Sequence, residues 1–329
     1  MDKKRMLFVD HAFHAHTRSA DFITDLLAEE YIIDLVYLDP ENIHTSDSFG
    51  SVIQKRYDCV IIWQLMPSLN WLKKFVSWDK ISFFPMYDAI PPLINPIWQE
   101  YRSTKIISFS KTLQKALCAR GFDAKYIQYF PEPQSVSELG TVDSVFYWQR
   151  VHNLPFQSII DTIKNDISKI HIHTSLDPHH CAVNITTDKP ITHSTWFDTK
   201  EEMYQKILES AIYIAPRLSE GIGMSFLEAM AMGRCVIAPN YPTMNEYIKN
   251  GKTGFLYDLD TISNLKIKDV RKIQENTLDY MKKGYRSWIK NRKKILKWIQ
   301  SPVHARNIDF GLKFFLFGKI PFFRWRKTK

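Results

Sequence analysis

Short apolar runs alternate with amphipathic segments through the first 130 residues of the chain. Apolar runs bounded by turn residues are typical of buried strands. We therefore expect strands at 6–10, 32–38, 58–63, 80–85, 104–110 and 126–130. Between them the pattern predicts helices at 20–30 and 111–120, and Gly121 is expected to end the second. Strands that alternate with helices in this way indicate a parallel sheet.

A second series of the same kind follows residues 131–143, a linker rich in Pro and Ser. Its predicted strands are 144–150, 168–173, 213–215, 235–238 and 255–257, and its predicted helices are 156–166, 200–210 and 225–232. Residues 174–194 are polar and are expected to be irregular. Residues 269–300 have a helical pattern with an apolar stripe, which Gly284 is expected to break.

The length of 329 residues is enough for two domains. We expect an α/β protein with Rossmann-like parallel-sheet domains at 1–135 and 144–268, a helix at 269–300 and a tail at 301–329. The hydrophobic content of 45% argues against a disordered or fibrous chain. The four cysteines form no CxxC pair, and three of them lie in or beside apolar runs, which favours buried, reduced thiols and suits the cytosol. The chain contains no run of about 18 apolar residues, so no membrane span is predicted.

The net charge of +9 is unevenly distributed. Residues 282–329 hold 15 Lys and Arg against one acid, Asp309, which leaves 29 basic and 34 acidic residues before them. The positive charge therefore belongs to the C-terminal part. Residues 301–329 mix aromatic and basic side chains, but Gly318 and Pro321 interrupt them. This composition favours the interface of an anionic membrane, and the alternative is docking onto the protein itself.

The most informative stretch is 214–258, which predicts a strand, a glycine turn, a helix and a further strand. Gly221 and Gly223 allow the backbone to approach a ligand closely. The helix that follows presents free N–H groups and a positive dipole end, which favour an anion such as a phosphate. Ser225 is a candidate N-cap with Glu228 at capping-box spacing, so Glu228 has a structural alternative to ligand binding. Glu220, ahead of the turn, could accept hydrogen bonds from sugar hydroxyls.

The string SEGIGMSFLEAMAMGRCVIAP, followed by NEYIKNGKTGFLYD, resembles the donor-binding signature of family-4 retaining glycosyltransferases with the GT-B fold, of the bacterial surface-polysaccharide type. The resemblance implies that Glu220 is a catalytic residue that contacts the donor sugar and that Glu228 holds the ribose. It also implies that backbone amides of the turn face the sugar and phosphates, which assigns to donor binding Gly221, Ile222, Gly223, Met224 and Ser225.

Arg150 matches the arginine that this family places against the donor diphosphate, and it is assigned a catalytic role. The family usually has a lysine about five residues later, but this chain has Leu154-Pro155-Phe156 there. Arg217 is a candidate substitute because two guanidinium groups can neutralise a diphosphate. Its alternative role is pairing with Glu220 or another acid. Phe197 is expected to border the pocket for the nucleotide base, or simply to pack.

Candidates for the acceptor side lie in the first domain. The loop after the first strand contains His14, His16 and Thr17, which in a GT-B protein would line the interdomain cleft; a solvated loop is the alternative. Asp88 follows a predicted strand at the edge where such sheets bind ligands, and it could orient an acceptor hydroxyl or cap a turn. The histidines lack cysteine partners, and no metal site is predicted.

The expected function is metal-independent transfer of a sugar, with retention of anomeric configuration, from a UDP- or GDP-linked nucleotide sugar to a glycan or lipid-linked acceptor. The nucleotide sugar is a substrate, and no cofactor is expected. Expected partners are the donor, the acceptor and an anionic membrane surface through 301–329, but not nucleic acid. The expected location is cytoplasmic and peripheral, on the inner face of the plasma membrane. The alternatives are a GT-B epimerase or phosphorylase acting on soluble substrates and a non-catalytic nucleotide-sugar or glycan-binding protein.

Overall fold

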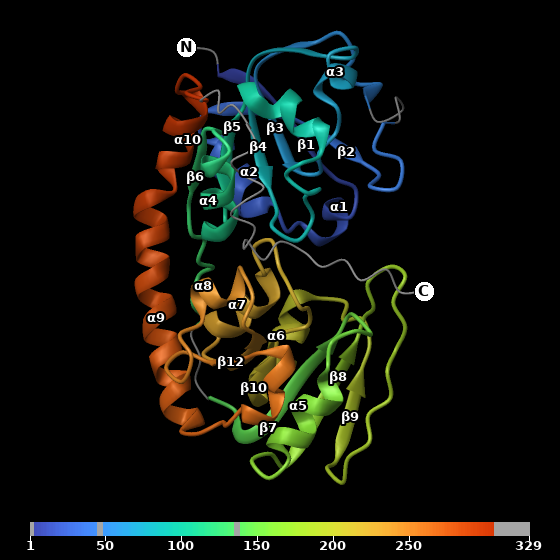
Figure 1. Cartoon of the computed structure of the whole chain (residues 1–329), viewed down its shortest axis with the longest axis vertical. Helices are drawn as coiled ribbons and strands as arrows, with labels where there is room; N and C mark the ends of the chain where they lie inside the picture. Colours follow the sequence, from blue (N-terminus) through green and yellow to red (C-terminus); the bar gives the residue numbers. More distant parts are fainter. Residues whose placement is uncertain (1–2, 45–48, 135–138, 306–329) are drawn as a thin grey trace, which may run out of the picture.

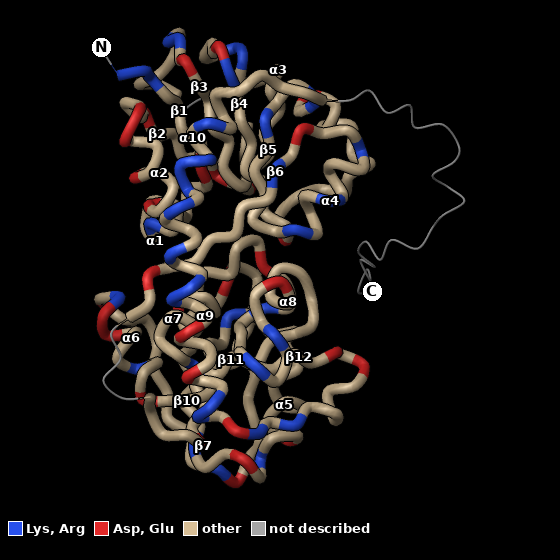
Figure 2. Tube along the Cα trace, turned by 90° about the vertical axis from the view of Figure 1, so that its left-hand side faces the viewer, with Lys and Arg blue, Asp and Glu red and all other residues tan. Residues whose placement is uncertain are grey.

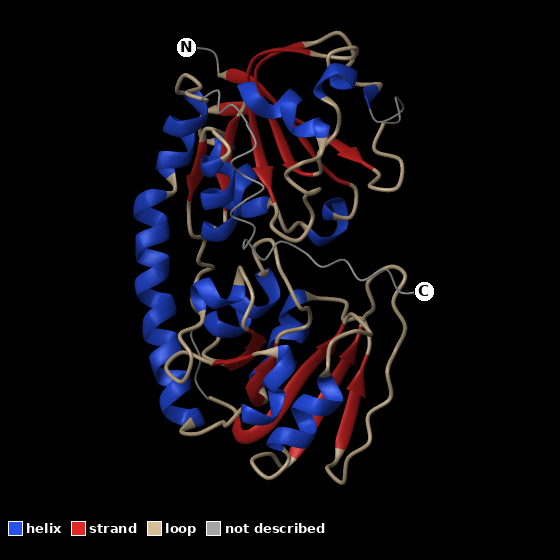
Figure 3. Cartoon of the chain, viewed as in Figure 1, coloured by secondary structure: helices blue, strands red, loops and turns tan. Residues whose placement is uncertain are grey.

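The computed structural model describes residues 3–44, 49–134 and 139–305 of the chain. These residues form two six-stranded sheets in which all neighbouring strands are parallel. Figure 1 shows one sheet above the other, with a long helical segment running beside both. Helices flank each sheet, as Figure 3 shows. The predicted α/β fold with two parallel-sheet units is confirmed.

The first sheet has the strand order β2-β1-β3-β4-β5-β6. Its strands are β1 (Lys4–His11), β2 (Tyr31–Leu38), β3 (Arg56–Gln64), β4 (Ser77–Pro85), β5 (Lys105–Ser108) and β6 (Ala124–Tyr126). The accompanying helical segments are α1 (His14–Thr17), α2 (Asp21–Ala28), α3 (Leu69–Leu72), η2 (Pro96–Ser103) and α4 (Lys111–Ala119). Phe8 and Ile61 face each other in β1 and β3, and both are fully buried, as expected when both faces of a parallel sheet are covered.

The sixth strand differs from the prediction of 126–130. It covers only Ala124–Tyr126, and the apolar residues that follow it leave the sheet. Phe130 packs instead against Gly284 in the long C-terminal helix, so these residues are apolar because they join the two halves of the molecule. A short apolar run cannot by itself distinguish these two forms of burial.

The second sheet has the strand order β12-β11-β10-β7-β8-β9. Its strands are β7 (Thr141–Gln149), β8 (Lys169–Thr174), β9 (Ile191–Ser194), β10 (Ser210–Ile214), β11 (Cys235–Pro239) and β12 (Phe255–Tyr257). Its helical segments are α5 (Phe156–Ile163), α6 (Lys200–Leu208), α7 (Met224–Ala231), α8 (Met244–Tyr247) and η3 (Leu259–Asn264). In the central strand β10, Ile212 is fully buried between Val145 and Cys235.

Strand β9 lies within the segment that was expected to be irregular. It pairs with β8 at the edge of the sheet, where its side chains are partly or fully exposed. His171 and His173 of β8 point toward this strand. His171 contacts Thr192 Oγ1 and Ser194 Oγ at 2.8 Å each, and His173 contacts Ser194 Oγ at 2.9 Å. Both histidines are therefore buried residues that bond through ring nitrogens to hydroxyl groups of the neighbouring strand.

The C-terminal segment forms α9 (Val270–Asn291) and α10 (Lys293–Gln300). The predicted break at Gly284 is wrong: Gly284 lies inside α9, and the helices meet at Arg292. The segment returns to the first sheet, where Trp298 Nε1 donates to Ile106 O at 3.2 Å. No helix within the described residues is both long and apolar enough to cross a membrane. Residues 306–329, most of the tail predicted to meet a membrane, lie outside the described residues.

Candidate functional site

The glycine turn after β10 ends at Gly223, which is the N-cap of α7. Gly223 has φ of +80°, and a Cβ atom there would lie 1.9 Å from the Phe226 ring, so both backbone conformation and space require glycine. The prediction that Ser225 caps the helix is wrong, because Ser225 lies within its first turn. Since Gly223 has no side chain, it offers no acceptor to the N–H groups of that turn. These groups remain suited to an anionic ligand.

Glu220 lies in the turn just before these glycines, and its side chain is only 9% exposed. Burial raises the pKa of Glu220 to about 7; the charge of Arg217 opposes this shift and that of Asp88 adds to it. The turn is fixed from behind by the buried Thr243, whose Oγ1 lies 2.8 Å from Glu220 O and 3.1 Å from Gly221 O. Near neutral pH, Glu220 can therefore exist both as a neutral acid and as a carboxylate.

Gly221 brings the turn against the first domain. A Cβ atom at Gly221 would lie 2.6 Å from Met86 Cβ and 2.8 Å from Asp88 Oδ1. Asp88 keeps an exposed surface, but Gly221 of the second domain lies against its carboxylate. The resulting loss of hydration raises the pKa of Asp88, against the opposing charge of Arg217. The predicted acceptor-side carboxylate is thus adjacent to the predicted donor-side turn.

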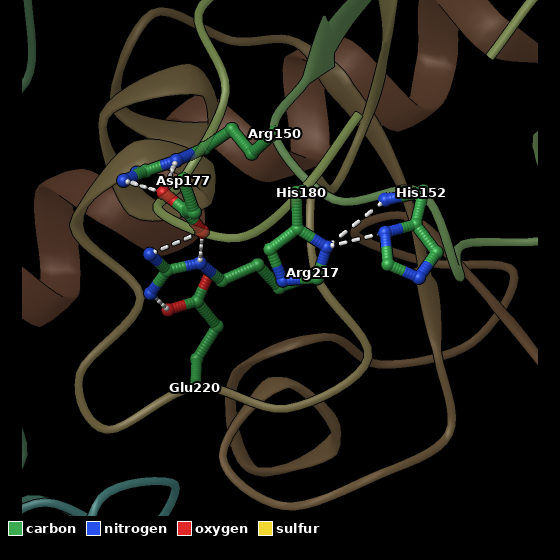
Figure 4. Close-up of polar contacts among 6 residues, drawn as sticks. All are labelled: Arg150, His152, Asp177, His180, Arg217 and Glu220. Atoms are coloured by element: carbon green, nitrogen blue, oxygen red, sulfur yellow. Dashed lines mark hydrogen bonds and ion pairs between the residues drawn. The ribbon is translucent and has the colours of Figure 1, made fainter. Parts of the chain in front are cut away.

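Arg150 and Arg217 converge on the carboxylate of Asp177, as Figure 4 shows. Arg150 follows β7, and its Nε and Nη2 atoms donate to Asp177 Oδ1 at 2.9 and 2.6 Å. Arg217 Nε donates to Asp177 Oδ2 at 2.8 Å, and its Nη2 lies 2.6 Å from the same oxygen. Arg217 Nη1 is 3.9 Å from Glu220 Oε2. The alternative role of Arg217, pairing with an acid, is therefore present, and the principal acid is Asp177.

Asp177 was not among the residues identified from the sequence. It follows β8, at the carboxyl edge where doubly wound sheets bind ligands, and this position was the available signal. The signal was weak because the segment around it is polar throughout. Burial alone would lower the pKa of Arg217, but Glu220, Asp177 and Asp88 together raise it, so the guanidinium stays charged.

Two histidines connect the Asp177 segment to the end of β7. His180 Nδ1 lies 2.9 Å from His152 Nδ1 and accepts a hydrogen bond from the backbone N–H of His152 at 3.3 Å. Because His180 Nδ1 already accepts from a backbone amide, we assign the proton between the two rings to Nδ1 of His152. Figure 4 shows this pair beside Arg150 and Arg217.

Glu228 does not form a capping box. Its Oε1 pairs with Lys200 Nζ at 2.6 Å, and the Glu228 side chain is 13% exposed. Burial alone would lower the pKa of Lys200, but the charge and hydrogen bond of Glu228 raise it. Lys200 was also missed from the sequence, where it reads as the start of an ordinary surface helix. Phe197 stacks on His173, with ring centroids 4.6 Å apart.

The three acceptor-side candidates that follow β1 differ in their exposure and contacts. His14 Nδ1 lies 2.7 Å from Oδ1 of the buried Asp10, whereas His16 and Thr17 are exposed on α1. Burial lowers the pKa of the neighbouring His11. Within the described ranges, no group of three His, Cys, Asp or Glu side chains is arranged to hold a metal ion.

Comparison with known proteins identifies related sequences and folds. Residues 190–295 match the family model described as "Glycosyl transferases group 1". A protein of Acidianus filamentous virus 1 (isolate United States/Yellowstone), named "Putative glycosyltransferase ORF313", is 29% identical to this chain over 136 residues. This match covers 40% of the present chain and 39% of the viral protein, so the chain spans well under half of that relative.

Two solved structures resemble nearly the whole chain. Sucrose-phosphate synthase from Thermosynechococcus elongatus has a TM-score of 0.66 at 10% identity, covering 90% of this chain and 98% of that one. HepE from Anabaena, solved with UDP and glucose, has a TM-score of 0.56 at 12% identity, covering 89% of this chain and 98% of that one. At these identities the likeness concerns the fold.

Proposed function

We propose that this chain, which has the GT-B fold predicted from its sequence and a group 1 glycosyl transferase match over residues 190–295, transfers a sugar from a nucleotide-sugar donor to a hydroxyl acceptor. The observation that carries the proposal is the surroundings of the turn 220–225. An uncapped helix N-terminus lies between two glutamates, and two arginines converge beside it.

Each part of this arrangement suits one part of the donor. The amides of the first turn of α7 and the guanidiniums of Arg150 and Arg217 suit the diphosphate. Glu220 suits the sugar hydroxyls, and Glu228 suits the ribose, where a hydroxyl would share its carboxylate with Lys200. HepE has been solved with UDP-glucose, which makes a UDP-linked sugar the first donor to test, before GDP-linked sugars.

The chemistry follows from where charge develops. When the bond between the sugar and the diphosphate breaks, negative charge builds on the leaving group, and preorganised N–H groups stabilise it. We propose that the arginines and amides do this without a divalent metal ion. The acceptor hydroxyl would attack from the side that the diphosphate leaves, which retains the anomeric configuration, and its proton would pass to the departing diphosphate oxygen. Asp88, adjacent to Gly221, would orient that hydroxyl.

We further propose that the acceptor is a glycan or a lipid-linked sugar at an anionic membrane surface. Residues 301–329 carry the aromatic and basic side chains for this contact, and α10 leads into them with Lys293, Lys294 and Lys297 along its length. In Figure 2, α9 and α10 face the viewer, with their lysines and arginines in blue. Because nucleotide sugars are made in the cytoplasm, such an enzyme would work at the inner face of the plasma membrane.

The test combines the purified full chain, radiolabelled UDP- and GDP-sugars and a membrane extract as the source of acceptor. We expect release of nucleoside diphosphate and transfer of label. Glu220→Ala should lower kcat about 100-fold or more, and Glu228→Ala should weaken binding of UDP roughly tenfold or more. Glu275→Ala, an exposed glutamate of α9, is the matched control.

Two results would contradict the proposal. One is the absence of nucleotide release with every donor tested. The other is full activity in both Glu220→Ala and Glu228→Ala, which would show that the reaction occurs elsewhere. To test the membrane contact, truncation after residue 300 should abolish binding to vesicles containing anionic lipid while soluble acceptors are still used.

A further inference from the structure

The carboxylate of Asp177 contacts both arginines of the candidate site, and neither the sequence motif nor the comparisons point to this residue. We propose that Asp177 is a positioning residue, which holds Arg150 and Arg217 in the arrangement that receives the diphosphate of the donor. This inference rests on the proposed function and adds a residue to it.

The contacts assign one carboxylate oxygen to each arginine. Oδ1 accepts from Nε and Nη2 of Arg150, and Oδ2 accepts from Nε and lies against Nη2 of Arg217. The side chains of Arg150 and Asp177 are 17% and 14% exposed, so water competes little for these bonds. Without Asp177 the two guanidiniums would repel each other, and among the described residues no other acid lies within ion-pair distance of Arg150. The carboxylate therefore makes their close approach possible.

The backbone in turn fixes Asp177. Its N–H donates to Arg150 O at 2.9 Å, and the N–H of Ser175 donates to Gln149 O at 3.3 Å. The N–H of His180 donates to Asp177 O at 3.2 Å, and the contact between His180 and His152 closes the same segment onto the end of β7. The backbone of Asp177 is thus anchored beside the end of β7, next to Arg150, so the position of the carboxylate does not depend on the arginines alone.

Asp177 leaves donors free on both guanidiniums. A guanidinium has five N–H groups. The contacts with Asp177 engage Nε and one N–H of Nη2, so Nη1 and the second N–H of Nη2 remain. Arg217 Nη1 lies toward Glu220, at 3.9 Å, and thus toward the glycine turn. A diphosphate beside that turn could accept from these donors while Asp177 stays in place.

A purely electrostatic role for Asp177 predicts the opposite result. Its negative charge lowers the net charge of the site, so removing that charge should tighten binding of an anion if charge alone matters. If orientation matters, removing the charge should weaken binding of the anion, because the two guanidiniums then repel each other and no longer converge. The amide introduced by Asp177→Asn could accept from only one arginine, and its NH2 group would face the other. The sign of the change therefore separates the two roles.

The experiment uses the full-length Asp177→Asn variant with a UDP-sugar as donor and with UDP as the binding probe. We expect kcat to fall about 10- to 100-fold and UDP affinity to fall as well, since charged hydrogen bonds are lost. Asp177→Glu, which keeps the charge, should restore part of kcat. Asp188→Asn, an exposed aspartate of the same connection between β8 and β9, should match the wild type.

A double-mutant cycle tests whether Asp177 acts through the arginines. Asp177→Asn should lower kcat further by less than about twofold in an Arg150→Ala, Arg217→Ala background, because the residues it positions are already gone. A fold defect would persist in that background and would also appear as a lower melting temperature of Asp177→Asn alone.

Four outcomes would overturn the inference. Unchanged kcat, or tighter UDP binding, in Asp177→Asn would leave the proposed function intact and remove the positioning role. An additive loss in the cycle would do the same. A wild-type protein that neither binds UDP nor transfers sugar would overturn the proposed function and this inference together.

Discussion

Glu246 Oε2 accepts a hydrogen bond from the backbone N–H of Lys111 at 2.6 Å, so a carboxylate of the second domain caps a helix of the first. Its Oε1 also accepts from the N–H and Oγ1 of Thr112, each at 2.9 Å. A carboxylate at a helix N-terminus satisfies free amides and interacts favourably with the helix dipole. Close by, Tyr247 Oη accepts from the N–H of Tyr129 at 3.1 Å. These bonds fix the relative position of the domains just beyond the glycine turn.

Replacing Glu246 should therefore destabilise the domain interface. We expect Glu246→Ala to lower the free energy of unfolding by about 1–3 kcal/mol, because charged hydrogen bonds are lost. Hydrogen exchange of the amides at 111 and 112 should accelerate most. Glu275→Ala, exposed on α9, serves as control for urea denaturation. Equal protection of these amides in Glu246→Ala and wild type would contradict the interdomain cap.

Gly284→Ala should be destabilising even though alanine is the better helix former. Alanine would gain about 1 kcal/mol of helix propensity. Its Cβ, however, would lie 2.2 Å from the Phe130 ring, and such overpacking costs about 1–3 kcal/mol. Thermal unfolding measures the net loss. The matched test is the double variant with Phe130→Leu, which should lose less than the sum of the single losses; strict additivity would mean that the clash is relieved elsewhere.

The raised pKa of Glu220 predicts both a pH-dependent stability and a pH-dependent rate. Between the unfolded pKa of about 4.5 and the folded pKa of about 7, the folded state binds more protons, so this group's contribution to stability is lost as pH rises. Glu220→Gln cannot ionise, so its stability relative to wild type should rise by up to roughly 3 kcal/mol from pH 4 to pH 8. Denaturation at both pH values checks this, with Asp188→Asn as control.

The rate should depend on the same ionisation. If the carboxylate form of Glu220 binds the sugar hydroxyls, kcat/KM of the wild type should rise with pH around neutrality. This rise should be absent from the residual activity of Glu220→Gln. A rise of the same size in the variant would assign the titration to another group.

His171 and His173 predict the opposite pH dependence. Burial lowers the pKa of each to about 4, below the unfolded value of about 6.5, so the unfolded state binds more protons in that window. Their contribution to stability is therefore lost as pH falls from about 6.5 to about 4. Replacing both by glutamine should flatten the fall in melting temperature between pH 7 and pH 4.5. His193→Gln, exposed on β9, is the control and should keep the wild-type slope.

The alternation of apolar runs and turns was sufficient to predict nearly every strand of both sheets. Burial on both faces of a parallel sheet demands continuous apolar runs, and these are visible in the sequence. The exceptions are informative. β9 is a short edge strand that carries polar residues, whereas Ile127, Tyr129 and Phe130 are buried where the two domains join. The glycine at position 284 was interpreted as a helix break, but it lies inside the helix, where the absence of a side chain leaves room for the Phe130 ring.

Local sequence was enough to predict the glycine turn at 220–225, because a strand, two glycines and a helix in succession are local features, although it placed the helix cap at Ser225 instead of Gly223. It could not determine the partners of those residues. Asp177 meets Arg150 across 27 positions and Arg217 across 40, and Glu246 reaches α4 across 135. Such pairs depend on which strand edges the fold places side by side. A polar residue in a polar segment carries no sign of its partner until the tertiary structure buries the two together.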